Sequence, residues 1–304
     1  MDRPGSGSKV RRLAALAGAA VLFLASCQRT PGPARDAAAA LRIMTFNIRM
    51  NTAGDGPNAW PRRKDIAAGT IAFHGAHIAG LQEVLHDQLR DLESLLPEYG
   101  WVGVGRDDGR EAGEYNPIFF LKARFKLLAS STFWLSETPN RPGVKGWDAA
   151  CPRIVTWARL RDEWTGRTLV AFNTHFDHMG ETARRESAAL ILREIPRLAG
   201  ALPVILTGDF NCTREDPAYK TLVTGGAGLA TLRDSRAASR TPPYGPSYSF
   251  NGFRAEAQPG PPIDHIFVGP SATVLRVGVL PGTWGGRFVS DHYPVMAEVR
   301  LARR

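Results

Sequence analysis

Five kinds of short polar motif in this sequence each place an acid, an amide or a histidine directly after an apolar run. They are Phe46-Asn47, Leu81-Gln82-Glu83, Asn173-Thr174-His175, Gly208-Asp209-Phe210-Asn211, and the two Asp-His pairs Asp264-His265 and Asp291-His292. Carboxylates and amide oxygens are ligands for a hard cation. A carboxylate can also take a proton from water, and a histidine can donate to an anion. This set of residues suits metal-assisted hydrolysis of an anionic ester.

Other catalytic signatures are missing from the sequence. It contains no Cys-His spacing typical of zinc sites, no Gly-rich loop for nucleotide phosphates and no serine nucleophile elbow. These absences disfavour a kinase, a zinc hydrolase and a serine esterase.

The elements that position these motifs are expected to be short strands separated by helices. We expect strands at 41–48, 77–81, 99–104, 117–121, 153–160, 168–174, 202–207, 263–268, 273–279 and 294–301, and helices at 61–73, 87–96 and 181–198. The run 202–207 is almost wholly apolar, which is typical of a central, buried strand. Two packed sheets flanked by helices would use this pattern. The motifs then fall at strand ends, where α/β sites usually lie.

The order and context of the motifs resemble the endonuclease/exonuclease/phosphatase superfamily, which includes DNase I-like nucleases, bacterial sphingomyelinases and inositol phosphatases. The resemblance runs from about Leu41 to Leu301, and its most specific part is Gly-Asp-Phe-Asn followed by Ser-Asp-His-Tyr-Pro-Val. It implies an α/β fold, a four-layered sandwich of two mainly antiparallel β-sheets flanked by α-helices. It also implies a metal-dependent phosphoester hydrolase. The stretch Phe133–Pro139 looks like a bacterial branch of metal-dependent hydrolases.

The resemblance and the chemistry of phosphoesters together suggest a role for each motif. Glu83 is expected to be the principal Mg²⁺ ligand, with Asn47 beside it and Asp291 as a further ligand; Mn²⁺ is an expected substitute. A glutamate at a buried strand end is costly unless it is paired or metal-bound. A salt-bridged glutamate is therefore the structural alternative.

The remaining motif residues are expected to act on water and phosphate. Asp209 would orient the nucleophilic water and take its proton, with the Asn211 amide helping to fix it. His292 would donate to a phosphate oxygen while Asp264 holds its other ring nitrogen, and His175 would contact the phosphate from the other side. In isolation, Gly-Asp-Phe-Asn would predict only a β-turn, and each histidine would predict a core residue.

Weaker candidates surround this set. Four residues are candidates for substrate binding: Arg153, Asn116, Asp177 and His178. In a strand, His265 points away from the face of Asp264 and is therefore expected to be structural. The loops 105–115, 136–152 and 235–262 are expected to set specificity. Their aromatic residues (Trp147, Tyr244, Tyr248 and Phe250) would either stack on bases or pin the loops.

The N-terminus has the pattern of a targeting segment. A basic stretch at 9–12 precedes the apolar run Leu13–Leu24, which is too short to span a bilayer. The following Leu24-Ala25-Ser26-Cys27 resembles a bacterial lipobox, which implies a signal peptide over 1–27, lipidation of Cys27 and a flexible tether over 28–40 before the domain at 41–304. The expected location is the bacterial cell envelope, outside the cytoplasm, with the outer membrane favoured over the inner membrane in a Gram-negative cell. An ordinary signal peptide with a chance cysteine is the alternative.

Net charge points to an anionic partner but does not name it. The chain carries +9, of which +6 remains after residues 1–27. This excess suits a polyanion such as nucleic acid, although an arginine-rich proteome would give the same value. The leading hypothesis is therefore a phosphodiesterase or nuclease. A phospholipase C-type enzyme or a sugar-phosphate or inositol-phosphate phosphatase is the alternative, and a catalytically silent binding module is the alternative from another class.

Two cysteines remain after the targeting segment. In an oxidising compartment, Cys151 and Cys212 would either form a disulfide or stay free. No protein partner is implied, and a monomer is expected.

Overall fold

The computed structural model describes residues 1, 40–225, 230–256 and 260–302. The expected signal peptide and tether lie outside the described residues, except for Met1 and Ala40. Cys27, the expected lipidation site, is among the residues that are not described. Ala40 is buried, and its carbonyl accepts a hydrogen bond from Arg124 Nη1 at 2.9 Å. Within the described ranges, no helix is long and apolar enough to cross a membrane.

Two six-stranded sheets form the centre of the molecule. The first sheet has the order β11 (Ala272–Val279), β14 (Val295–Leu301), β1 (Leu41–Asn47), β2 (Ile78–Gln82), β4 (Ile118–Leu121) and β3 (Tyr99–Val102). The second has the order β5 (Phe125–Trp134), β6 (Ile154–Asp162), β7 (Arg167–His175), β8 (Val204–Asp209), β10 (Asp264–Val268) and β9 (Arg233–Asp234). In each sheet one neighbouring pair is parallel, β1 with β2 and β7 with β8, and the other pairs are antiparallel.

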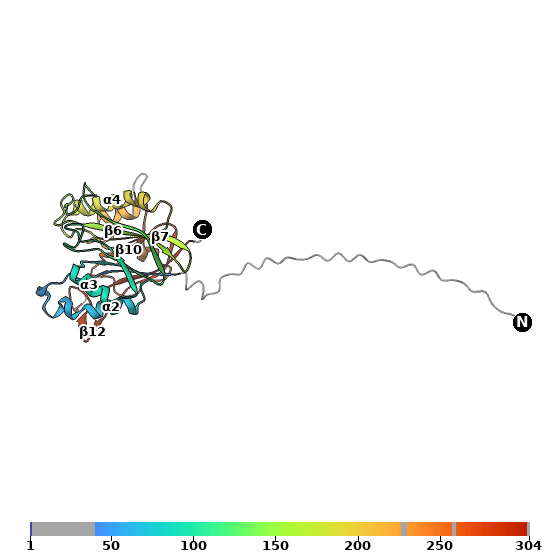
Figure 1. The fold of residues 1–304 in the computed structure, drawn as a ribbon, viewed down its shortest axis with the longest axis horizontal. Coiled ribbons are helices and arrows are strands. Elements are labelled where there is room, and N and C mark those ends of the chain that lie inside the picture. The colour runs from blue at the N-terminus through green and yellow to red at the C-terminus, as the bar shows by residue number, and fades with distance from the viewer. Residues whose placement is uncertain (2–39, 226–229, 257–259, 303–304) are drawn as a thin grey trace.

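Helices cover the outer faces of both sheets. Helices α2 (Lys64–Phe73) and α3 (His86–Leu95) pack on the first sheet, and α4 (Glu181–Ala199) and α5 (Pro217–Thr224) pack on the second. In Figure 1, α4 and the pair α2 and α3 lie on opposite sides of the stacked sheets. Short elements complete the fold: η1 (Ala53–Asn58), η2 (Trp60–Arg62), α6 (Ser235–Ala238), and the hairpin of β12 (Thr283–Trp284) and β13 (Arg287–Phe288). The expected four-layered sandwich is confirmed.

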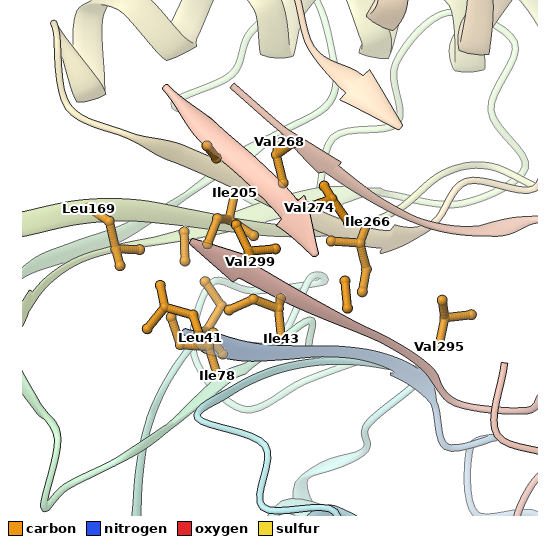
Figure 2. Close-up of a cluster of buried hydrophobic side chains, with 14 of the residues drawn as sticks. Leu41, Ile43, Ile78, Leu169, Ile205, Ile266, Val268, Val274, Val295 and Val299 are labelled. Atoms are coloured by element: carbon orange, nitrogen blue, oxygen red, sulfur yellow. The ribbon is translucent and has the colours of Figure 1, made fainter. Parts of the chain in front are cut away.

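The interior between the sheets changes from apolar to polar along β1. Leu41 and Ile43 point into the apolar cluster that joins the two sheets, which Figure 2 shows with residues from β7, β8 and β10. Successive strand residues alternate between faces, so Thr45 and Asn47 share this inner face, and both are fully buried. The apolar part holds the sheets together, and the polar part places the buried Asn47 at the last position of β1.

A buried polar network joins the two sheets just below that end. The Asn173 side chain on β7 donates to the carbonyls of Leu81 at 2.7 Å and Pro117 at 3.0 Å. Its oxygen accepts from Gln82 Nε2 at 2.7 Å and Thr207 Oγ1 at 3.0 Å. The first sheet presents Gly80 here, and a Cβ at that position would lie 2.1 Å from Thr207 Oγ1. Glycine therefore allows the sheets to approach closely enough for the network to form.

Several elements differ from the sequence expectations, among them the short β9, α6, β12 and β13, which were not expected. The expected helix at 61–73 begins as the 3-10 turn Trp60–Arg62 and becomes α-helical at Lys64. Strand β5 was not expected, because it lies at a sheet edge and is exposed over most of its middle, so no clean alternation marks it. Helix α5 was not expected either.

Candidate active site

The two parallel strand pairs end at the same place. In the first sheet Asn47 is in register with Gln82, and in the second sheet His175 is in register with Asp209. Asp264 begins the antiparallel strand β10 directly opposite Asp209. The residues that follow apolar runs in the sequence are thus brought from both sheets to one end of the sandwich, where a cleft of about 640 Å³ opens.

Asp209 lies at the centre of this cleft. Its Oδ2 accepts from Asn47 Nδ2 at 2.9 Å, and its Oδ1 accepts from the Asn211 backbone N–H at 3.0 Å. His175 Nε2 and His292 Nε2 lie 3.5 and 3.7 Å from Oδ2. Burial, and next the charge of Asp264, raise the pKa of Asp209 to about 7. A carboxylate with this pKa is able to accept a proton near neutral pH.

His292 forms a buried pair with Asp264. Its Nδ1 lies 2.8 Å from Asp264 Oδ2, and both side chains are nearly inaccessible to solvent. Burial opposes the charged ring, but the carboxylates of Asp264 and Asp209 together raise the pKa of His292 well above its ordinary value. A protonated ring donates from both nitrogens, so Nε2 presents a proton to the cleft.

His175 is held in the opposite protonation state. Burial, and next Arg153, lower the pKa of His175 well below its ordinary value, so the ring is neutral. Asn211 Nδ2 lies 3.0 Å from His175 Nε2 and 3.0 Å from the Phe176 carbonyl. Because an amide nitrogen can only donate, Nε2 is the acceptor and Nδ1 carries the proton.

A group of carboxylates gathers on the side of the first sheet. Glu83 accepts from Asn47 Nδ2 at 2.9 Å and from the Met50 backbone N–H at 3.1 Å. Arg49 lies 3.8 Å from both Glu83 and Asp291 and forms a closer pair with Asp55. Burial raises the pKa of Asp291. The charge of His292 opposes this rise, and the charge of Glu83 adds to it. A carboxylate whose ionisation is disfavoured beside another acid lies in an environment that attracts a cation.

Strained backbone is concentrated around the same cleft. Five non-glycine residues of the described chain have positive φ, and four of them line the cleft: Arg49, Glu83, Asn211 and Phe253. Such conformations cost about 1–3 kcal/mol each and persist where the surroundings enforce them, often at functional sites.

The four weaker candidates divide into cleft residues and supporting residues. Arg153 and His178 line the cleft, and Arg153 Nη2 lies 3.1 Å from His178 Nδ1. Asp177 lies behind them. It accepts from Arg153 Nε at 3.4 Å and from the backbone of Gly180 at 2.8 Å, so it positions Arg153 at the start of α4. Asn116 is buried and donates to the Ile154 carbonyl at 3.0 Å, away from the cleft lining.

The remaining residues considered in the sequence are His265, the two cysteines and the aromatic residues of the loops. His265 is buried against the Cys212 carbonyl at 3.1 Å and Asp234 at 3.3 Å, as expected for a core residue. Cys151 and Cys212 are both free thiols, so the disulfide alternative is wrong. Trp147 and Tyr248 pack on the core clusters, whereas Phe250 is 44% exposed and lines the cleft.

Sequence reasoning missed several groups that shape the cleft. Arg49, Arg106 and Glu114 line it, and Arg106 Nη1 donates to Glu114 at 2.8 Å. Ser290 Oγ donates to the Asn47 carbonyl at 2.8 Å and connects the last motif to β1. Of these residues, Ser290 could have been predicted from the sequence, because it stands directly before the motif residue Asp291. Arg49, Arg106 and Glu114 lie in loops and belong to none of the motifs.

Two groups of side chains in the described part of the chain could hold a metal ion. They are Asp209 with Asp264 and His292, and Cys151 with Asp177 and His178. Glu83 and Asp291, the carboxylates expected to bind the metal, are not members of either group.

Comparison with known proteins identifies the family. Residues 44–292 match the profile of the endonuclease/exonuclease/phosphatase family. The chain therefore belongs to this family, whose members are phosphoester hydrolases. A crystal structure of the endonuclease/exonuclease/phosphatase from Bacteroides vulgatus is 44% identical with a TM-score of 0.82, covering 86% of this chain and 99% of that one.

A particular relative has a named substrate type. The mannosyl-6-phosphatase of Bacteroides thetaiotaomicron is 37% identical with a TM-score of 0.79, covering 85% of this chain and 99% of that one. Nocturnin of Drosophila melanogaster is 22% identical over 204 residues, and the carbon catabolite repressor protein 4 homolog 5 of Arabidopsis thaliana is 29% identical over 171 residues. These stretches are 60% and 53% of this chain but 30% and 37% of the relatives, so the chain spans about a third of their length.

Proposed function

We propose that this protein is a divalent-metal-dependent phosphomonoesterase that releases phosphate from a phosphorylated sugar. The observation that carries the proposal is the pairing of the cleft arginines. Arg49 pairs with Asp55 at 3.0 Å, Arg106 with Glu114 at 2.8 Å, and Arg153 with Asp177 at 3.4 Å. A nucleic-acid backbone is bound by basic groups that neutralise successive phosphates. Paired arginines instead suit a small substrate with one phosphate and several hydroxyls.

The likeness to the mannosyl-6-phosphatase supports the same substrate class. That likeness covers 85% of this chain and 99% of the phosphatase at 37% identity. The diesterase or nuclease hypothesis rested on net charge, and that charge is not concentrated as unpaired arginine in the cleft. The binding-module alternative is disfavoured because every residue of the expected catalytic set is present and faces or supports the cleft.

We assign the metal to the carboxylate group on the first sheet. Glu83 and Asp291 would hold Mg²⁺, with Asn47 beside them, since hard oxygen ligands suit this ion. The Asn47 oxygen already accepts from the Arg49 backbone N–H at 3.0 Å, so coordination would use its second lone pair. The Asp209–Asp264–His292 group is a poorer cation site, because a protonated His292 cannot be a ligand. When bound, the ion would neutralise charge on the phosphate oxygens.

The side chains of this protein then divide the remaining work. Asp209, fixed by Asn47 and Asn211, orients a water molecule and takes its proton. His292 Nε2 donates to a phosphate oxygen as negative charge builds, and Asp264 keeps the ring protonated and oriented. Removal of one such donor typically lowers the rate by a factor of about 10²–10³.

A substrate panel tests this proposal. Full-length protein with Mg²⁺ would be assayed on mannose 6-phosphate, glucose 6-phosphate, p-nitrophenyl phosphate, bis-p-nitrophenyl phosphate, DNA, RNA, sphingomyelin and inositol phosphates. Preferred release of phosphate from hexose phosphates, abolished by EDTA and restored by Mg²⁺ or Mn²⁺, is the expected result. Preference for a diester or a nucleic acid would overturn it.

We also propose that the enzyme is lipid-anchored through Cys27 in the cell envelope. The support is the basic, apolar and small-residue pattern that ends at this cysteine. Cys27→Ser should move the protein from the membrane fraction to the soluble fraction. Unchanged membrane association of this variant would contradict lipidation.

A further inference from the structure

Two buried N–H groups on one wall of the cleft lack a hydrogen-bond acceptor. Arg153 Nη1 and His175 Nδ1 make no hydrogen bond within the described residues, although their side chains are only 5% and 6% exposed. Unsatisfied buried donors are rare, because each costs free energy that a partner would recover. Both residues line the cleft, so the two unpaired atoms belong to its wall.

Both donors face the same carboxylate across a gap. Glu114 Oε2 lies 4.0 Å from Arg153 Nη1 and 3.9 Å from His175 Nδ1, beyond hydrogen-bond distance in each case. Glu114 is held in place by Arg106 Nη1 at 2.8 Å, and its side chain is 12% exposed. The wall therefore presents these two donors and one charged acceptor, and Arg106 Nε is a further buried N–H without a hydrogen bond within the described residues.

The supporting contacts fix Arg153 as well. Asp177 accepts from its Nε at 3.4 Å, and His178 Nδ1 lies 3.1 Å from its Nη2. Asp177 is itself held by the backbone N–H groups of Gly180 and Met179 at the start of α4. Because Nε and Nη2 have these partners, Nη1 is the guanidinium nitrogen left without a hydrogen bond within the described residues.

The combination of donors and acceptor selects the chemistry of the ligand. A second phosphate would meet the Glu114 carboxylate, and an ammonium group would meet the Arg153 guanidinium. A hydroxyl satisfies both, because its oxygen accepts from an N–H and its proton goes to a carboxylate.

We propose that Glu114 and Arg153 form a subsite for hydroxyl groups of the sugar, next to the catalytic Asp209. The inference rests on the proposed function and deepens it, since this subsite would decide which phosphorylated polyol is cleaved. His175 connects the two regions: its Nε2 lies 3.5 Å from Asp209 while its Nδ1 faces Glu114.

The test compares Glu114→Gln with Glu111→Gln. Glu111 lies on the same loop, but its side chain is 75% exposed, so its replacement is a matched control. The measured quantity is the ratio of kcat/KM for mannose 6-phosphate to kcat/KM for p-nitrophenyl phosphate, which has no sugar hydroxyls. Glu114→Gln keeps an acceptor oxygen but removes its charge, so it should lower this ratio about 10-fold, the difference between a charged and a neutral hydrogen bond. A ratio within about twofold of the wild-type value would overturn the subsite.

A binding measurement separates this inference from the proposed function. In the Asp209→Asn background, calorimetric titration with mannose 6-phosphate and with inorganic phosphate reports affinity without turnover. Glu114→Gln should weaken mannose 6-phosphate binding about 10-fold and leave phosphate binding unchanged. Equal weakening of both ligands, or of neither, would refute the subsite even if the enzyme is a sugar phosphatase. Glu114-dependent binding in a protein that cleaves no phosphomonoester would support the subsite and refute the proposed function. Arg153→Lys, which keeps the charge but removes the Nη1 donor, provides a second variant if Glu114→Gln does not fold.

Discussion

Replacement of Asn173 by alanine should weaken the connection between the two sheets directly beneath the cleft. The Asn173 amide makes four buried hydrogen bonds, to the carbonyls of Leu81 and Pro117 and from the side chains of Gln82 and Thr207. Three of these partners belong to the first sheet or the segment leading into it, so the amide connects the layers as well as filling space.

The expected loss of stability follows from the number of partners. Each buried hydrogen bond of this kind contributes about 1 kcal/mol net, and an abandoned partner costs at least as much. Asn173→Ala should therefore lower the free energy of unfolding by about 4 kcal/mol, a large fraction of the roughly 5–15 kcal/mol typical of a folded domain. Thr207→Val, which removes a single hydroxyl from the same network, should cost about 1 kcal/mol.

Urea unfolding followed by tryptophan fluorescence measures both values. The midpoint should shift strongly for Asn173→Ala and weakly for Thr207→Val, with similar m-values. Activity of the folded alanine variant should also fall, because His175 and Glu83 follow the network in sequence. If Asn173→Ala costs less than Thr207→Val, the network does not hold the sheets as described.

Two further predictions concern pH and catalysis. Burial, and next the charge of Arg124, lower the pKa of His77 from 6.5 to about 3. Below pH 6.5 the unfolded chain therefore takes up a proton that the folded chain does not. The free energy of unfolding should fall by up to about 5 kcal/mol between pH 6.5 and pH 3. His77→Asn keeps an acceptor for the Arg42 backbone N–H, which lies 2.9 Å from His77 Nδ1, and should flatten that fall in urea titrations; equal pH slopes in both proteins would contradict the assignment. Asp264→Asn should lower kcat of the folded protein about 10²–10³-fold, because His292 loses the partner that keeps it protonated; steady-state kinetics with kcat near the wild-type value would contradict that role.

Much of the fold could be predicted because its signals are local. Strand β8 is a continuous apolar run, and α4 begins and ends close to its predicted limits. The resemblance to a known superfamily supplied the arrangement into two sheets. The edge strand β5 escaped prediction because an exposed edge places few constraints on side-chain polarity.

The site was predictable where a functional residue follows an apolar strand. Asp209 and His175 end neighbouring parallel strands, so their convergence follows from the register. Glu114 was not predictable, because its position depends on how the loop after β3 folds back against Arg106 and Arg153. Asn116 lies in the same region, yet its amide turns to the Ile154 carbonyl, a contact between residues far apart in sequence.

The central claim is that Asp209 activates water for metal-dependent release of phosphate. The most direct measurement is phosphate release from mannose 6-phosphate by wild-type protein, Asp209→Asn and the surface control Asp65→Asn, each with Mg²⁺ and after chelation by EDTA. Asp209→Asn should lose turnover while still binding mannose 6-phosphate, and wild type and Asp65→Asn should be equally active only when Mg²⁺ is present. Turnover by Asp209→Asn at the wild-type rate, or Mg²⁺-independent turnover by the wild type, would contradict this account.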